Sequence, residues 1–298
     1  MRVICLMNRK SGAMGTADPE AVRNAVGAAF EEQGHRIEFV ESAPGRLDNA
    51  MDRAILKSPD VLLVAGGDGS VSLGASKLAG TSTALGVLPA GTMNLYARTL
   101  KLPIETVEAA RRLAAGNIGR ADTGQLNGRT FIHQAGVGIH PRLIRFRAHM
   151  SFGSRFGKIR ASAVATLFAF RAARRKAATI AIDGKLHHVR GLAIAVTVNP
   201  LGEGHLPFAD RIDAGTLGVY YSEVHHPIEI ARLGIDLAFG NFRHNPRVQA
   251  FTGRHVVIRT HPPRHHQLSI DGELADLPEQ MEISIAPKSL NVLLPAEA

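Results

Sequence analysis

The sequence of 298 residues contains one cysteine, Cys5. A single thiol excludes an internal disulfide, and scarce cysteine is typical of proteins that fold in a reducing compartment. Long apolar runs are missing as well: Val3–Met7 is too short for a secretory signal, and Ala161–Phe170 is too short to span a bilayer. We therefore expect a soluble, cytoplasmic protein.

Acidic residues are missing from one long stretch. Between Pro141 and Lys176 the sequence holds ten lysines and arginines and no aspartate or glutamate, within a net charge of +9. Together with the phenylalanines interleaved there, this is typical of a helix peripheral to an anionic membrane surface. A core helix with a solvated basic face fits equally well. No nucleic-acid-binding signature accompanies the charge, so we expect no nucleic acid partner, and a homodimer stays open.

The length and the apolar content of 45% indicate a globular protein with two domains. In the first third, short apolar runs alternate with helical patterns, which predicts a parallel α/β sheet. The expected strands are 3–7, 36–41, 61–65 and 84–88, and the expected helices are 18–34 and 46–57.

The second half is dominated by strand patterns, which predicts a mostly antiparallel β domain. A hairpin is expected at Asp183-Gly184, because Asp-Gly between alternating apolar residues is a strong turn signal. The predicted domains are 1–122 and 123–285. The last segments, 281–285 and 290–295, are read as separate strands, and residues 286–298 could rejoin the first domain.

Three strands of the predicted parallel sheet end in loops with similar chemistry. Their sequences are Asn8-Arg9-Lys10-Ser11-Gly12, Gly66-Gly67-Asp68-Gly69-Ser70 and Pro89-Ala90-Gly91-Thr92-Met93-Asn94. Loops at the carboxyl edge of a parallel sheet converge on ligands, and glycine N–H groups suit phosphate. We therefore expect the three loops to form one site for an anionic ligand, with Ser70 capping the following helix.

Asp68 does not fit a bare phosphate site, because a carboxylate repels phosphate. It makes sense either if a metal ion lies between them or if Asp68 orders the loop. The Walker pattern GxxxxGK[ST] is absent, so Lys10, Arg98 or a metal would have to supply positive charge.

Four motifs together resemble the diacylglycerol kinase catalytic-domain family, which includes bacterial lipid kinases and sphingosine kinases. They are NRKSG from Asn8, GGDGS from Gly66, GTMNLYAR from Gly91 and SIDGE from Ser269. The resemblance implies an α/β nucleotide-binding domain with an NAD kinase/phosphofructokinase-like parallel sheet, and a β-sandwich lipid-binding domain. It also implies an ATP-dependent lipid kinase that uses Mg²⁺ and a diacylglycerol-like or sphingoid-like substrate.

The resemblance also assigns roles to residues. Asn8 and Ser42 would help to bind ATP, and Thr92 with Asn94 would form a second phosphate loop. Glu273 would be the general base, with Asp68 as the rival base and as a candidate magnesium ligand. The first phosphate loop would comprise Gly66, Gly67, Asp68, Gly69, Ser70, Val71 and Ser72.

The sequence departs from the family pattern at two acids. Leu95 and Ala214 stand where the family usually has aspartate, which puts the metal arrangement in doubt. Asp213 could replace the acid lost at 214 as a metal ligand, or it is simply a turn residue. Asp271-Gly272, which precedes Glu273, is likewise a hairpin-turn signal on spacing alone.

Two other functions stay open. An NAD kinase-like enzyme would share the GGDG loop, but the Asn-Glu dipeptide that accompanies it in that family is absent. A non-catalytic nucleotide or lipid sensor is favoured by Leu95 and Ala214.

Overall fold

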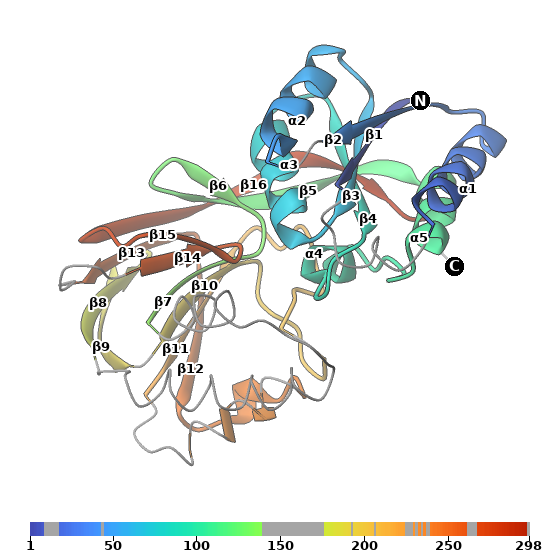
Figure 1. Ribbon diagram of the computed structural model, residues 1–298. Coiled ribbons are helices and arrows are strands. Elements are labelled where there is room, and N and C mark those ends of the chain that lie inside the picture. Colours follow the sequence, from blue (N-terminus) through green and yellow to red (C-terminus); the bar gives the residue numbers. More distant parts are fainter. Residues whose placement is uncertain are drawn as a thin grey trace. The chain divides into compact units, whose positions relative to one another are not determined.

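Figure 1 shows the computed structural model, which describes residues 1–8, 18–42, 45–138, 176–191, 193–205, 207–223, 229, 232–233, 235–236, 239–260 and 267–296. The chain forms two compact units. Unit 1 comprises Met1–Thr123, Arg211–Ala214 and Ala286–Ala298, and unit 2 comprises Gly124–Asp210 and Gly215–Ile285. The division after Thr123 falls inside a strand, β5 (Asn117–Leu126), and not in a linker.

Unit 1 is built on a parallel sheet with the strand order β2-β1-β3-β4-β16. These neighbouring strands pair in parallel, and Val292 of β16 lies opposite Leu85 of β4. The elements are β1 (Arg2–Asn8), α1 (Pro19–Glu32), β2 (Arg36–Ser42), α2 (Leu47–Leu56), β3 (Val61–Gly66), α3 (Asp68–Leu78), β4 (Ala84–Pro89), α4 (Leu95–Thr99), α5 (Thr106–Ala114) and the later part of β16 (Gln280–Leu294). The predicted parallel α/β fold is confirmed.

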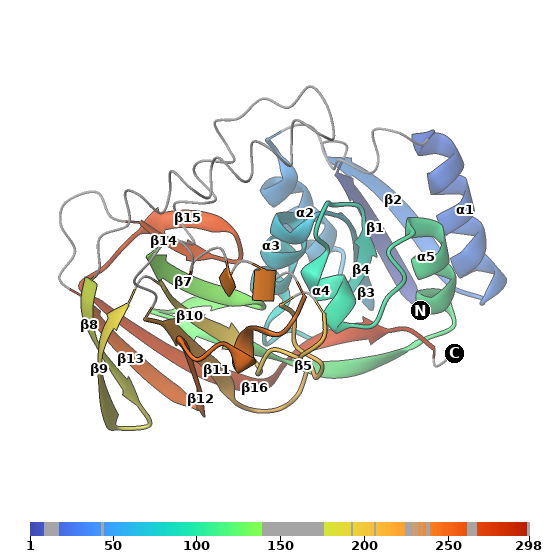
Figure 2. The same ribbon diagram turned by 90° about the horizontal axis from the view of Figure 1, so that it is seen from below.

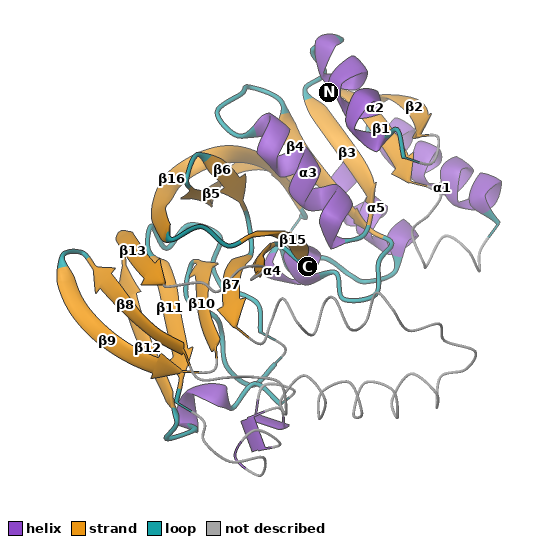
Figure 3. Cartoon of the chain, turned by 60° about the vertical axis from the view of Figure 1, so that its left-hand side comes forward, coloured by secondary structure: helices purple, strands orange, loops and turns teal. Residues whose placement is uncertain are grey.

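Helices cover both faces of this sheet, which explains why its central strands are apolar throughout. All six residues of β3 and of β4 are buried. In Figure 1, α2 and α3 lie on one face and α1 and α5 on the other. Figure 3 shows α3 running along β3 and β4. The first helix starts as predicted: Asp18 accepts the N–H of Glu20 at 3.0 Å, and Pro19 occupies the first turn.

Unit 2 consists of antiparallel strands in two layers. One layer has the order β16-β13-β8-β9 and the other has the order β12-β11-β10-β7-β14-β15. A single hydrophobic cluster contains residues of both, among them Ile180, Val219, Val256 and Leu268, so the layers pack as a sandwich (Figure 2). The predicted β-sandwich is confirmed.

The remaining elements of unit 2 are short, and β6 pairs with β5. The elements are β6 (Arg129–Phe131), β7 (Gln134–Gly138), β8 (Lys176–Ile182), β9 (Lys185–Gly191), β10 (Ala193–Val198), β11 (Leu217–Ser222), η1 (Phe242–His244), β12 (Val248–Gly253), β13 (His255–Thr260), β14 (Gln267–Ile270) and β15 (Glu273–Asp276). The hairpin predicted at Asp183-Gly184 joins β8 to β9, and both turn residues have positive φ.

Two local predictions are wrong. The segments 281–285 and 290–295 form one strand, β16, whose chain passes through Lys288 with a φ of 51°. At this residue the backbone N–H is accepted by the carboxylate of Asp122 at 2.8 Å. Ser70 does not cap α3, because the helix already begins at Asp68 with Gly67 as its N-cap.

Within the described ranges, none of the helices is both long enough and apolar enough to span a bilayer. The basic stretch from Pro141 to Arg175 lies outside the described residues.

Candidate functional site

The first loop of the candidate site turns tightly between β3 and α3. A Cβ placed on Gly66 would lie 2.6 Å from the Cβ of Ser70, so only glycine fits there. Gly67 precedes the helix in an extended conformation, and Gly69 is exposed with nothing within 4 Å of an added Cβ. The N–H of Ser70 bonds the carbonyl oxygen of Gly67 at 2.9 Å, and the N–H groups that precede it lie at the positive dipole end of α3.

The second loop, between β4 and α4, lies directly against the first. A Cβ on Gly91 would approach the Cα of Gly67 to 2.6 Å and the Oδ1 of Asn94 to 2.9 Å. Asn94 closes this loop on itself: it accepts the N–H of Gly91 at 2.8 Å and donates to the oxygen of Gly91 at 3.0 Å. Asn94 is buried and left-handed, with a φ of 51°, whereas Thr92 is exposed.

Asp68 fastens the two loops together. Its Oδ2 accepts the N–H of Asn94 at 3.0 Å, and its Oδ1 accepts the N–H of Leu95 at 2.7 Å. These bonds satisfy N–H groups at the start of α4 that have no partner inside the helix. The sequence left open whether Asp68 binds a metal ion or orders the loop, and these two hydrogen bonds are of the ordering kind.

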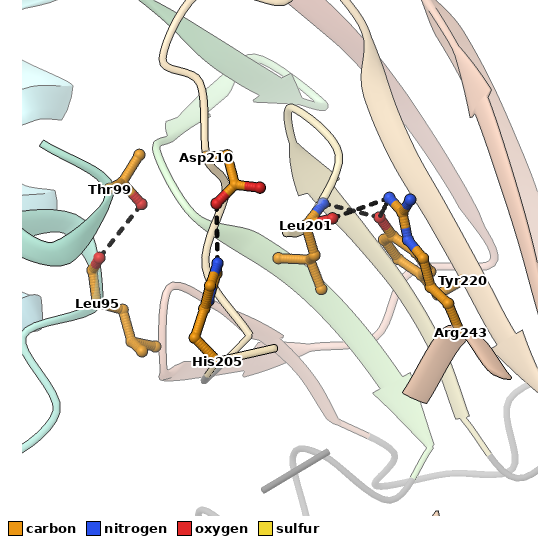
Figure 4. Close-up of polar contacts among 7 residues, drawn as sticks. All are labelled: Leu95, Thr99, Leu201, His205, Asp210, Tyr220 and Arg243. Carbon is orange, nitrogen blue, oxygen red and sulfur yellow. Dashed lines mark hydrogen bonds and ion pairs between the residues drawn. The ribbon is translucent and has the colours of Figure 1, made fainter. Parts of the chain in front are cut away.

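The helix that follows is short and is held by its own side chains. Thr99 donates to the carbonyl oxygen of Leu95 at 3.2 Å, as Figure 4 shows. The Nε of Arg98 donates to the carbonyl oxygen of Met93 at 3.0 Å, so this guanidinium lies at the second loop. Arg98 is thus one of the candidates for the positive charge, and that role stays a prediction.

The end of β1 joins the first loop through one side chain. The amide nitrogen of Asn8 donates to Ser70 Oγ at 2.9 Å. Ser42 ends the neighbouring strand β2 in parallel register with Asn8 and is buried. The described ends of β1, β3 and β4 thus converge as the parallel-sheet argument predicted.

Of the other residues of unit 1 predicted to bind ATP, some lie in the described part of the chain and some lie outside it. Val71 and Ser72 lie in the second turn of α3, with Val71 buried. Lys10, Ser11 and Gly12 lie outside the described residues. The ligand-binding roles of all these residues stay predictions.

Glu273 belongs to unit 2, at the start of β15. It follows a two-residue turn in which Asp271 has a φ of 47° and Gly272 a φ of 87°. Its Oε2 accepts a hydrogen bond from Nη2 of Arg129 at 2.6 Å, and both side chains are about half exposed. Sequence reasoning did not find Arg129, because 144 residues separate the two partners.

Asp271 is more than a turn residue. Its carboxylate is buried and accepts the backbone N–H groups of Ile132, His133 and Gln134, each at 2.9 Å. An aspartate can accept three such bonds because it has no donor of its own to satisfy. Asp271 therefore ties the β14–β15 turn to the connection between β6 and β7.

The metal-ligand roles predicted for Asp68 and Asp213 stay predictions. Both oxygens of Asp68 accept backbone N–H groups, and Asp213 is paired with Arg211 at 3.1 Å. In the described part of the chain, no three His, Cys, Asp or Glu residues are grouped to hold a metal ion. Asp122 is a buried acid that the sequence did not single out, but its Oδ1 accepts the N–H of Lys288.

The loop that connects β10 to β11 is also held by side-chain contacts (Figure 4). Tyr220 accepts the N–H of Leu201 at 2.8 Å, and Arg243 donates to both the Leu201 oxygen and the Tyr220 hydroxyl. Burial acts to lower the pKa of Arg243, but hydrogen bonding to Tyr220 helps to raise it overall. Farther along, His205 contacts Asp210 at 2.8 Å. These contacts fix the loop.

The single thiol takes no part in this chemistry. Cys5 is fully buried in β1, and burial raises the pKa of its thiol to about 12, outweighing the opposite effect of Arg23. A neutral, inaccessible thiol is a packing group.

The fold and the joined loops define a class of protein: a parallel α/β sheet with a glycine-rich loop and a second loop joined at its carboxyl edge, and an antiparallel β-sandwich. The family described as "Diacylglycerol kinase catalytic domain" matches residues 2–126. The family described as "YegS C-terminal NAD kinase beta sandwich-like domain" matches residues 137–294. Because the second match spans more than half of the chain, the chain belongs to the family with this β-sandwich-like domain, and its first part is similar to the diacylglycerol kinase catalytic domain.

Individual curated proteins are similar to parts of the chain. An uncharacterized protein of Synechocystis is 25% identical over 259 residues, which cover 85% of this chain and 59% of that protein. A diacylglycerol kinase of Bacillus subtilis is 34% identical over 113 residues, which cover 37% of each chain. These matches span less than two thirds of either relative.

The fold is shared with a crystal structure of a diacylglycerol kinase from Bacillus anthracis. The TM-score is 0.71 at 17% identity, and the alignment covers 98% of this chain and 96% of that one. Likeness at this identity shows the fold alone.

Proposed function

We propose that this protein is an ATP-dependent lipid kinase that transfers the γ-phosphoryl group of ATP to a hydroxyl of a diacylglycerol-like or sphingoid-like lipid. The observation that carries the proposal is the joining of the glycine-rich loop after β3 to the loop after β4 by Asp68, with Asn8 against the first loop. The similarity to kinases supports the same reaction.

The nucleotide would bind at the joined loops. Phosphoryl transfer needs positioning and charge neutralisation, which backbone N–H groups and cations can supply. The exposed Gly69 and Thr92 leave room for phosphate oxygens, and Arg98 carries a positive charge at the second loop. A magnesium ion arriving with ATP would offset further phosphate charge.

The acceptor hydroxyl needs a base, and Glu273 is proposed for this role. The hydroxyl oxygen would form a bond to the γ-phosphorus while the bond from that phosphorus to the ADP oxygen breaks. The hydroxyl proton would pass to the Glu273 carboxylate. The products are then ADP and the phosphorylated lipid.

The protein would meet its substrate at an anionic membrane surface. The support is the sequence from Pro141 to Lys176, with ten basic and no acidic residues. Such segments gain affinity from each lysine or arginine near anionic lipid. Co-sedimentation with vesicles tests this: binding should require phosphatidylserine or phosphatidylglycerol and weaken with salt, and equal binding to neutral vesicles would contradict it.

A non-catalytic nucleotide or lipid sensor is the second candidate. Leu95 and Ala214 favour it, because both replace acids that the family usually carries. In addition, Asp68 already uses both oxygens on backbone N–H groups.

One assay separates the candidates. ATP labelled at the γ-phosphate is offered with diacylglycerol and sphingoid lipids in mixed micelles, with NAD as a parallel acceptor, to wild type and Glu273→Gln. Label in lipid that Glu273→Gln lowers to a small but measurable rate is the expected result. Label in NAD supports an NAD kinase-like enzyme, and nucleotide binding without transfer to any acceptor supports a sensor. If Glu273→Gln keeps full turnover, Glu273 is not the general base.

A further inference from the structure

The ion pair between Arg129 and Glu273 lies at the surface of unit 2. Nη2 of Arg129 is 2.6 Å from Oε2 of Glu273, and the two side chains are 46% and 58% exposed. Pairs this exposed contribute about 0–1 kcal/mol to stability. Stability alone therefore gives little reason for the close geometry.

Arg129 lies in β6, a short strand that depends on contacts with neighbouring segments for its position. The strand β6 has three residues and pairs with β5 alone. Its start is anchored by Asn127, whose side chain donates to the Gln280 oxygen at 3.1 Å and accepts the Glu282 N–H at 2.8 Å. Its end is anchored by Phe131, which is buried against Gly124: a Cβ on that glycine would lie 2.2 Å from the ring.

Glu273 is anchored from the same segment. The carboxylate of Asp271 accepts the N–H groups of residues 132–134, which directly follow β6, and Asp271 donates its own N–H to the Gln134 oxygen. One buried acid thus fixes the backbone that leads to both members of the ion pair. The fixed backbone still leaves the side chain of Glu273 free to rotate, and the ion pair with Arg129 restricts that rotation.

We propose that Arg129 is a positioning residue that holds the Glu273 carboxylate for proton transfer. The inference rests on the proposed function, in which Glu273 takes the proton of the acceptor hydroxyl. The ion pair uses Oε2, so in the described part of the chain Oε1 is left to accept that proton. Arg129 stays charged throughout and gains or loses no proton.

The test compares Arg129→Gln, Arg129→Lys and the control Arg259→Gln in the lipid phosphorylation assay. Arg259 is another exposed arginine of unit 2, and it donates to the Gln280 side chain at 3.1 Å. Arg129→Gln should lower kcat about ten- to hundredfold, with the KM for ATP and the Tm unchanged. Arg129→Lys should recover part of the loss, and Arg259→Gln should behave as wild type.

A double variant keeps the inference testable if Arg129→Gln lowers the Tm. In a Glu273→Gln background, Arg129→Lys should change kcat no further, because a positioning residue acts through its partner. Equal losses in both backgrounds, or full kcat in Arg129→Gln, would overturn the inference. If wild type labels no lipid, the proposed function itself fails; if Glu273→Gln is inactive while Arg129→Gln is fully active, only the role of Arg129 fails.

Discussion

The Oδ1 of Asp68 accepts the N–H of Leu95 at 2.7 Å across 27 residues of sequence. This bond joins the start of α3 to the start of α4, and the second oxygen of Asp68 repeats the contact at Asn94. The acid of the glycine-rich loop thus keeps two loops at the carboxyl edge of the sheet in one arrangement. If the loops bind the proposed nucleotide, this bond preorganises them, since they need not be ordered when the ligand binds.

Replacing Asp68 by asparagine should destabilise unit 1. The amide keeps one acceptor oxygen but turns an NH₂ group toward the second backbone N–H, so one bond becomes a contact between two donors. We expect a loss of about 1–3 kcal/mol in the free energy of unfolding, measured by urea denaturation.

Asp52→Asn is the matched control for this experiment. Asp52 is an exposed acid whose carboxylate pairs with Lys77, so its loss should cost less than about 1 kcal/mol. Equal effects of the two substitutions would show that Asp68 does not hold the loops together.

Two glycines of the loops should respond oppositely to alanine. Gly91→Ala places a methyl group 2.6 Å from the Cα of Gly67, which is backbone and cannot move away cheaply. We expect this variant to lose stability and nucleotide affinity together, by about 1–3 kcal/mol in unfolding free energy.

Gly69→Ala separates folding from ligand binding. Its added methyl group meets nothing within 4 Å, and alanine in a helix is favoured over glycine by about 1 kcal/mol. The Tm should stay level or rise, whereas nucleotide affinity measured by calorimetry should fall if phosphates approach this backbone. Unchanged affinity would place the phosphates elsewhere.

The buried thiol gives stability a predictable pH dependence. The pKa of Cys5 is raised by burial from 9.0 to about 12, so the folded thiol stays protonated where the unfolded thiol ionises. Its contribution to stability is therefore complete below pH 9.0 and declines as pH rises toward about 12. The decline should be roughly 1.4 kcal/mol per pH unit.

Comparison with Cys5→Ala isolates this contribution. The stability advantage of wild type over Cys5→Ala in urea unfolding should shrink between pH 9 and 11. An advantage that stays constant over that range would show that the thiol ionises equally in both states. A thiol reagent should label Cys5 only after unfolding.

The sequence predicted the parts of this fold that local patterns determine. Strands buried on both faces, such as β3, are visible as apolar runs, and the Asp183-Gly184 turn is visible as a dipeptide. The convergence of the loops followed from a general property of parallel sheets. Each of these inferences needs only a few neighbouring residues.

Partnerships between distant segments could not be predicted in the same way. The sequence singled out Asp68 as a site residue. It could not show that the Asp68 carboxylate bonds the backbone, because that depends on where the N–H of Leu95 lies. Arg129 belongs to no sequence motif, so only its contact with Glu273 in the structure points to a role for it. The pattern of β16 is interrupted at Lys288, and the acid that accepts its N–H, Asp122, is 166 residues away.

The two Asp-Gly turns have the same sequence signal but should differ in their response to alanine. Asp183 accepts the N–H groups of Arg254 and His255, all at exposed positions. Asp271 is 8% exposed and accepts three N–H groups at the β6–β7 connection. Water can replace the carboxylate at the first turn, but it has little access to the second.

Asp183→Ala should therefore cost about 0.5–1.5 kcal/mol in the free energy of unfolding, the net value of an ordinary hydrogen bond. Asp271→Ala leaves several poorly hydrated donors unsatisfied and should cost about 3–5 kcal/mol. Urea unfolding measures both values, and amide hydrogen exchange at residues 132–134 should accelerate in Asp271→Ala alone. Similar costs for the two variants would mean that the buried carboxylate does not support this part of the sandwich, and Glu273 would then lose the anchor that the structure gives it.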